Sequence, residues 1–130
     1  MCRIYFSHSV SDRATSRSAA ALDTIRAALP TFAIVDPNSI EISVGHSRDH
    51  AGGGRDFFKD TIQGCDALAF LRLNDGRVGE HWAREIKWAL AVEIPVFEVA
   101  KGGLVPVDRM PQKIRTRDDL WKESLDSEWI

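Results

Sequence analysis

The chain has 130 residues, of which 44% are hydrophobic and 28% are charged, and its formal net charge at pH 7 is −2. This size fits one domain with a single core, residues 1–130, and the charge provides no basic field that would attract nucleic acid. No apolar run approaches the ~20 residues that span a bilayer, and the first residues do not resemble a signal peptide. The two cysteines have neither disulfide nor zinc spacing. We therefore expect a cytoplasmic protein that binds neither nucleic acid nor membranes.

Short apolar strands alternate with helices along the chain. Pro30 ends the first helix, and Gly64 is well placed as the C-cap of the second. The predicted elements, in chain order, are strand Arg3–Ser7, helix Arg17–Leu29, strand Phe32–Val35, helix Arg55–Gln63, strand Ala67–Leu71, helix Trp82–Ala91, strands Pro95–Val99 and Leu104–Val107, and a final helix Asp118–Ser124.

This alternation predicts a parallel sheet with helices on both faces. The strands are continuous apolar runs, as expected when both faces of a sheet are buried. Residues 65–97 alone contain a strand, a glycine-bearing loop, a helix and a second strand, which is a βαβ unit. We predict an α/β fold: a three-layer, doubly wound sheet of about five mostly parallel strands in a flavodoxin-like, or Rossmann-like, arrangement.

Polar and glycine residues follow the strands at the edge where such sheets bind ligands. Ser7 and His8 follow the first strand, while Gly76 and Gly79 precede the third helix. The glycines allow a ligand to approach the backbone, and the start of the helix favours an anionic group. Glu85 lies in the first turns of that helix. It is a candidate nucleophile or base, although a carboxylate there can also be an ordinary helix residue.

An irregular segment, residues 37–54, precedes Arg55 and contains two histidines at i, i+4 spacing, His46 and His50. On a helix this spacing could hold zinc, but the surrounding glycines disfavour a helix, so we expect surface histidines and no metal site. The run Gly52–Gly54 could cradle a phosphate, yet no P-loop pattern follows it. A hinge or lid is the favoured interpretation of the glycines, with Arg55 as a possible phosphate contact.

Three motifs carry a resemblance to a known family. Ile4-Tyr5-Phe6-Ser7 resembles an opening strand with a small polar loop, and Asp66-Ala67-Leu68-Ala69-Phe70 resembles an aspartate that opens an apolar strand. Glu85 lies ten positions before Pro95. These features resemble the nucleoside 2-deoxyribosyltransferase superfamily, which includes the deoxynucleoside 5′-monophosphate N-glycosidases, over most of residues 3–99.

The resemblance implies an enzyme without a cofactor that cleaves the N-glycosidic bond of a nucleoside or nucleotide, by hydrolysis or by transfer. Glu85 would attack the anomeric carbon and form a glycosyl-enzyme ester. Tyr5 would orient Glu85, and Asp66 or Asp75 would face the base and assist its departure. Proteins of this superfamily usually form dimers or larger assemblies, so the resemblance also implies a homo-oligomer.

Each candidate also has a structural interpretation. Tyr5 can be a core aromatic residue, Asp66 can begin its strand, and Asp75 with Gly76 is a common turn signal. Two other functions stay open. The run Ser7-His8-Ser9-Val10-Ser11-Asp12 resembles the opening of a TIR-like domain, which either cleaves NAD with a helix glutamate or acts in signalling. The third alternative is a non-catalytic nucleotide-binding protein.

Overall fold

The computed structural model describes residues 2–8, 15–36, 55–73 and 75–116 of the chain. Among these residues, the central sheet consists of β1 (Arg3–Ser7), β2 (Ala33–Val35), β3 (Ala67–Phe70), β5 (Val96–Ala100) and β6 (Gly103–Val107). The helices are α1 (Ser16–Ala28), α3 (Arg55–Gln63) and α4 (Glu80–Ala91). A small second sheet pairs β4 (Val78–Gly79) with β7 (Ile114–Arg115).

The strand order of the central sheet is β2-β1-β3-β5-β6. Strands β2, β1, β3 and β5 are parallel, and β6 runs antiparallel to β5. The segment β3-α4-β5 is the predicted βαβ unit, because β3 and β5 are parallel neighbours joined through α4. The predicted α/β fold with a mostly parallel, doubly wound sheet is therefore confirmed.

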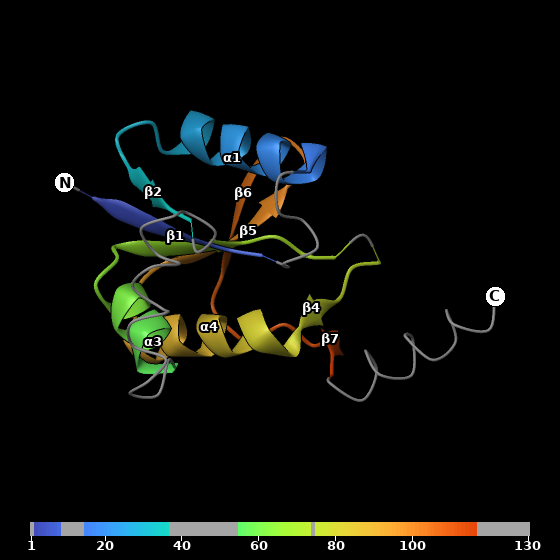
Figure 1. Cartoon of the computed structure of the whole chain (residues 1–130). Coiled ribbons are helices and arrows are strands. Elements are labelled where there is room, and N and C mark those ends of the chain that lie inside the picture. The colour runs from blue at the N-terminus through green and yellow to red at the C-terminus, as the bar shows by residue number, and fades with distance from the viewer. Residues whose placement is uncertain (1, 9–14, 37–54, 74, 117–130) are drawn as a thin grey trace.

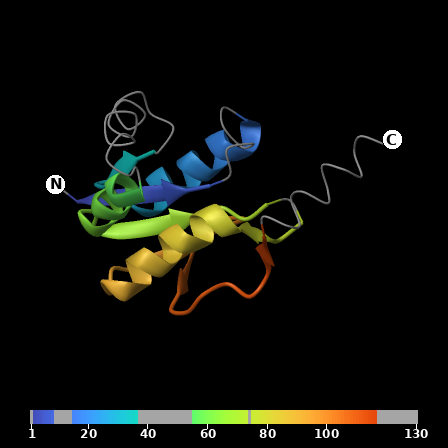
Figure 2. The ribbon, with the colours of Figure 1, turned by 60° about the horizontal axis from the view of Figure 1, so that its bottom comes forward.

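Helices cover both faces of this sheet. Figure 1 shows α1 on one face and α3 and α4 on the other. In Figure 1 and in the turned view of Figure 2, α4 begins beside β4 and β7, at the end of the sheet where β1 and β3 finish. The start of α4 thus lies at the carboxyl edge of the parallel strands, where ligands bind in folds of this kind.

The side chains of β1 alternate between two separate apolar cores. Ile4 and Phe6 pack in the core that includes Ala21 and Ile25 of α1. Tyr5 lies in the other core, which includes the buried side chains of α4. Because successive side chains of a strand point to opposite faces, Ser7 shares the α4 face with Tyr5.

The ends of the helices follow from local chemistry. Thr15 caps α1, since its side chain accepts a hydrogen bond from the backbone N–H of Ser18. Helix α4 begins at Glu80, two residues before the predicted start, after Gly79 in an extended conformation. An acidic residue in the first turn suits the positive end of the helix dipole. Helix α3 occupies the predicted residues, Arg55–Gln63, and its predicted end at Gln63 is confirmed.

One feature was not expected, and two predictions are not tested. The β4–β7 sheet was not predicted, because strands of two residues are too short for apolar periodicity to show. Residues 37–54 and the predicted helix Asp118–Ser124 lie outside the described residues. Within the described part of the chain, none of the helices has the length and apolar character required to cross a bilayer.

Candidate functional site

Glu85 is buried on the sheet-facing side of α4. Its exposed fraction is 5%, and the residues that share this helix face, Trp82, Ile86 and Ala89, are buried and apolar. The spacing i, i+3, i+4 and i+7 explains why these four residues face the sheet together. A carboxylate in such surroundings is destabilising unless it receives hydrogen bonds.

Two hydroxyl groups of β1 supply these hydrogen bonds. Tyr5 Oη donates to Glu85 Oε2 at 2.5 Å, and Ser7 Oγ donates to Glu85 Oε1 at 2.9 Å. Both donors are completely buried. Hydroxyl groups bound to a carboxylate form short, strong hydrogen bonds, and here each carboxylate oxygen has one. The site therefore joins the last part of β1 to the second turn of α4.

The environment of Tyr5 keeps its hydroxyl group protonated. Burial raises the pKa of Tyr5 far above its ordinary value of 10.0, and the nearby carboxylate of Glu85 raises this pKa further. A protonated Tyr5 donates its only hydroxyl hydrogen to Glu85. This hydrogen bond fixes the position of one carboxylate oxygen, and Ser7 fixes the other.

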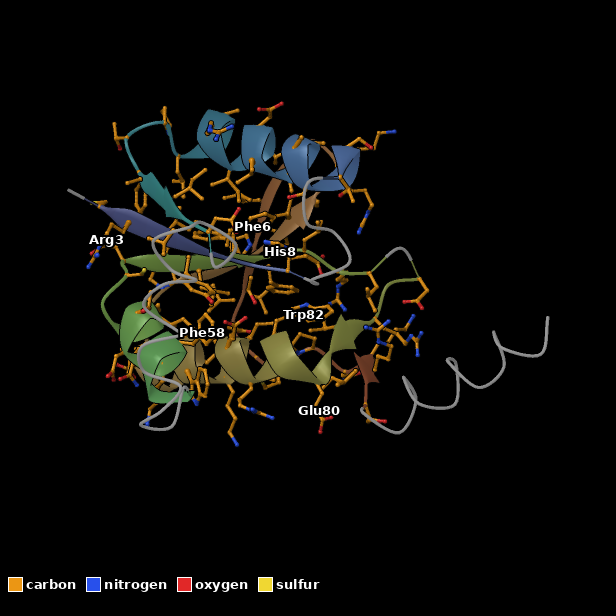
Figure 3. All side chains as sticks on the ribbon, viewed as in Figure 1. Arg3, Phe6, His8, Phe58, Glu80 and Trp82 are labelled. Carbon is orange, nitrogen blue, oxygen red and sulfur yellow. The ribbon has the colours of Figure 1, made fainter. Side chains whose placement is uncertain are left out.

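His8 follows Ser7, but its described contacts are with Phe6 and Asp36 and not with Glu85. Its ring centroid lies 4.5 Å from that of Phe6, and its Nε2 lies 3.2 Å from Oδ1 of Asp36, directly after β2. Figure 3 shows Phe6 and His8 on the path of β1, above Trp82. His8 is buried, with an exposed fraction of 6%. Its contact with Asp36 links the carboxyl ends of β1 and β2.

Asp75 and Gly76 form a turn in the β3–β4 connection. Asp75 accepts hydrogen bonds from the side chain and the backbone N–H of Arg77, at 2.9 Å and 3.0 Å. These hydrogen bonds hold the pKa of the exposed Asp75 below its ordinary value. Gly76 has φ +86°, a conformation that favours glycine. The described contacts of Asp75 thus belong to its own turn and not to Glu85.

Asp66 lies at the other end of the sheet. Its Oδ2 accepts a hydrogen bond of 2.7 Å from the backbone N–H of Arg3, the first residue of β1. Figure 3 shows Arg3 and His8 at opposite ends of β1. The structure therefore does not bring Asp66 to the carboxyl edge. Arg55 is the first residue of α3, and its side chain lies outside what the structure describes.

Gly79 allows the ring of Trp82 to pack on the backbone. A Cβ atom at position 79 would lie less than 3.0 Å from three atoms of the benzene ring of Trp82, Cε3, Cζ3 and Cη2. Close packing of an aromatic ring is the structural reason for glycine here. From the sequence, Trp82 was predicted only as a helix residue and not as part of the site.

The structure thus brings Tyr5, Ser7 and Glu85 together. A sequence signal for this cluster exists: Glu85 is a charged residue within the apolar stripe of α4, which indicates a specific buried partner. The residues that the structure describes contain no group of three or more histidine, cysteine or acidic side chains able to hold a metal ion. Comparisons of the chain with protein-family models, curated proteins and solved structures found no match.

Proposed function

We propose that this protein cleaves the N-glycosidic bond of a small nucleoside or nucleotide, with Glu85 as the nucleophile. The observation that supports the proposal is the pair of hydrogen bonds from Tyr5 and Ser7 to the two oxygens of Glu85. They hold a buried carboxylate in one orientation at the carboxyl edge of the sheet. Oriented carboxylates of this kind serve as nucleophiles at sugar carbons.

The proposed reaction has two steps. A carboxylate oxygen of Glu85 forms a bond to the anomeric carbon while the carbon–nitrogen bond to the base breaks. The base leaves with the bonding electron pair and takes up a proton. Water then attacks the anomeric carbon of the sugar ester, which releases the free sugar and restores the carboxylate. A second nucleobase in place of water would give transfer of the 2-deoxyribosyl group.

Tyr5 has a defined part in this proposal. Because burial and the charge of Glu85 raise its pKa, Tyr5 remains a hydrogen-bond donor over the whole physiological pH range. It is a positioning residue, since its hydrogen bond directs Glu85. Positive charge develops on the sugar in the transition state, so a carboxylate held nearby also stabilises it electrostatically.

The test is to incubate the protein with 2′-deoxynucleosides, their 5′-monophosphates and NAD, and to separate the products by chromatography. We expect free base from a deoxy substrate, and a loss of more than a hundredfold in kcat with Glu85→Gln. Glu80→Gln is the matched control, because Glu80 belongs to the same helix but is exposed on its outer side, as Figure 3 shows.

Other outcomes would contradict the proposal. Undiminished cleavage by Glu85→Gln would exclude Glu85 as the nucleophile. Release of nicotinamide from NAD, with no cleavage of deoxy substrates, would favour the TIR-like alternative. Binding of nucleotides without any product would favour the non-catalytic alternative.

The proposal also includes the localisation and the oligomeric state of the protein. We infer a cytoplasmic enzyme that works as a homodimer or larger homo-oligomer, in line with the resemblance of its motifs. Sedimentation of the purified protein at several concentrations tests the assembly, and a monomer at all concentrations would contradict this part of the proposal.

A further inference from the structure

The indole nitrogen of Trp82 is a buried donor that has no described partner. The Trp82 side chain is 4% exposed, and its Nε1 is fully buried without a hydrogen-bond acceptor among the residues that the structure describes. Buried N–H groups are nearly always paired, because an unpaired one loses its hydrogen bonds to water on folding. An exception on the helix that carries Glu85 therefore calls for an explanation.

Trp82 lies three residues before Glu85, on the same face of α4. Both are buried toward the sheet, and Figure 3 shows Trp82 on the sheet side of the helix. Side chains at i and i+3 of a helix are neighbours, with about 5–6 Å between their Cβ atoms. This spacing is the scale of one sugar ring, so a nucleoside bound at Glu85 would lie close to Trp82 as well.

The orientation of the indole ring is fixed by Gly79. The benzene edge of Trp82 packs where a Cβ at position 79 would lie. Since Nε1 is on the opposite edge of the indole, the N–H group faces away from the Gly79 backbone. A donor held in one direction binds an acceptor without a further loss of conformational freedom.

We propose that the Trp82 N–H group is a substrate-binding donor of the Tyr5–Ser7–Glu85 site and takes an oxygen acceptor of the bound nucleoside. This inference rests on the proposed function and adds a specificity-determining residue to it. The acceptor is an oxygen of the sugar or a carbonyl oxygen of the base, and these two sources are distinguished by comparing two nucleosides.

The test measures binding by calorimetry in a Glu85→Gln background, which slows turnover. 2′-Deoxyinosine carries a carbonyl on its base and 2′-deoxyadenosine does not. We expect Trp82→Phe to raise Kd about tenfold, the loss of one well-formed hydrogen bond. Trp88→Phe is the matched control on the same helix and should leave Kd unchanged. An effect on deoxyinosine alone assigns the acceptor to the base, and an effect on both nucleosides assigns it to the sugar.

A second variant separates binding from packing. Replacement of Trp82 by 3-benzothienylalanine keeps the bicyclic shape and exchanges N–H for sulfur. Because the N–H group has no described acceptor to lose, we expect the Tm of the free protein not to fall, while Kd rises as with Trp82→Phe. A lower Tm with unchanged Kd would show a structural hydrogen bond and overturn the inference.

The inference and the proposed function can fail separately. Cleavage by the unmodified protein with equal nucleoside affinity in the Trp82 variants would overturn the inference alone. Binding that weakens in these variants, without cleavage by the unmodified protein, would support the inference and overturn the proposed reaction. No binding of either nucleoside would overturn both.

Discussion

At Glu85, a carboxylate lies among apolar side chains and depends on two hydroxyl groups of another element. Hydrogen bonds to a charged group contribute about 1.5–3 kcal/mol each, more than those between neutral groups. The two bonds differ in length, 2.5 Å from Tyr5 and 2.9 Å from Ser7. The shorter bond comes from a fully buried phenol, so we expect Tyr5 to be the more important donor.

Tyr5→Phe removes this donor and keeps the aromatic ring. We expect the free energy of unfolding to fall by about 1.5–3 kcal/mol and kcat to fall about tenfold or more, because Glu85 loses part of its orientation. Ser7→Ala should have a smaller effect on both. Urea denaturation and the cleavage assay measure the two quantities. An unchanged kcat in Tyr5→Phe would mean that Tyr5 does not position the nucleophile.

His8 gives a second prediction at this scale. Asp36→Asn keeps the size of the partner of His8 but removes its charge, and the pair is largely buried. We expect the stability of the protein to fall by about 1–2 kcal/mol, since a partly buried hydrogen bond to a charged group is weakened. Asp23→Asn is the control, because Asp23 is exposed on α1. Equal stability of the two variants would contradict the role of the pair.

At the scale of elements, the start of α4 is the part that organises the site. Gly79 ends β4 and caps α4, and its lack of a side chain allows Trp82 to fold back on the backbone. Glu85 follows one turn later. The position of both side chains therefore depends on how the helix begins after the strand.

Gly79→Ala places a methyl group against the Trp82 ring, so one of them must move. We expect a destabilisation of about 1–3 kcal/mol, typical of overpacking, with weaker nucleoside binding. Gly103→Ala is the matched control, because a Cβ there has no neighbour within 4 Å and Gly103 has no positive φ. Thermal unfolding compares the two variants. A stable Gly79→Ala with normal binding would show that the ring accommodates the methyl group.

The elements also show what the sequence could and could not predict. The strands β1, β3 and β5 are mostly apolar, and their alternation with helices was sufficient to predict the sheet. The direction of β6 was not predicted, although Gly102, with φ +91° in the short turn between β5 and β6, carries the signal of a hairpin. The pairing of β4 with β7 joins residues far apart in the chain, and no local pattern encodes it.

The same limits apply to the site. Glu85 could be named from the chain, because the helix after β3 starts at the carboxyl edge, whereas Tyr5 was named only through the resemblance of its motif. Asp66 could have been predicted at the amino-terminal edge of the sheet, since it directly precedes the parallel strand β3. The contact of Ser7 with Glu85 could not be predicted, because it depends on the register of β1 against β3 and on how closely α4 packs on the sheet. Both depend on the packing of the whole core.

For the whole molecule, the ionisation of Tyr5 couples to global stability. Tyr5 is the single tyrosine of the chain, and its pKa in the folded protein lies far above the ordinary value of 10.0. Above pH 10 the unfolded chain releases the phenolic proton while the folded chain retains it. This contribution to stability is therefore complete below pH 10 and decreases as the pH rises further.

We expect the stability of the unmodified protein to fall above pH 10 by about 1.4 kcal/mol per pH unit more than that of Tyr5→Phe. The comparison removes the effect of lysine titration, which is common to both proteins. Tyrosinate absorbance should appear together with the loss of circular dichroism. Tyrosinate formation in a protein that is still folded would contradict the buried state of Tyr5.

The pair of hydroxyl groups on β1 has a consequence for how the chain assembles. A shift of β1 by one residue against β3 would turn Tyr5 and Ser7 to the α1 face and bring Ile4 and Phe6 toward the carboxylate of Glu85. The misaligned sheet would then contain a buried charge without these two donors. The hydrogen bonds of Glu85 thus favour the correct alignment of β1, because a misaligned strand leaves this carboxylate without Tyr5 and Ser7 and is less stable. The residue on which the proposed activity depends therefore also helps to select the strand register.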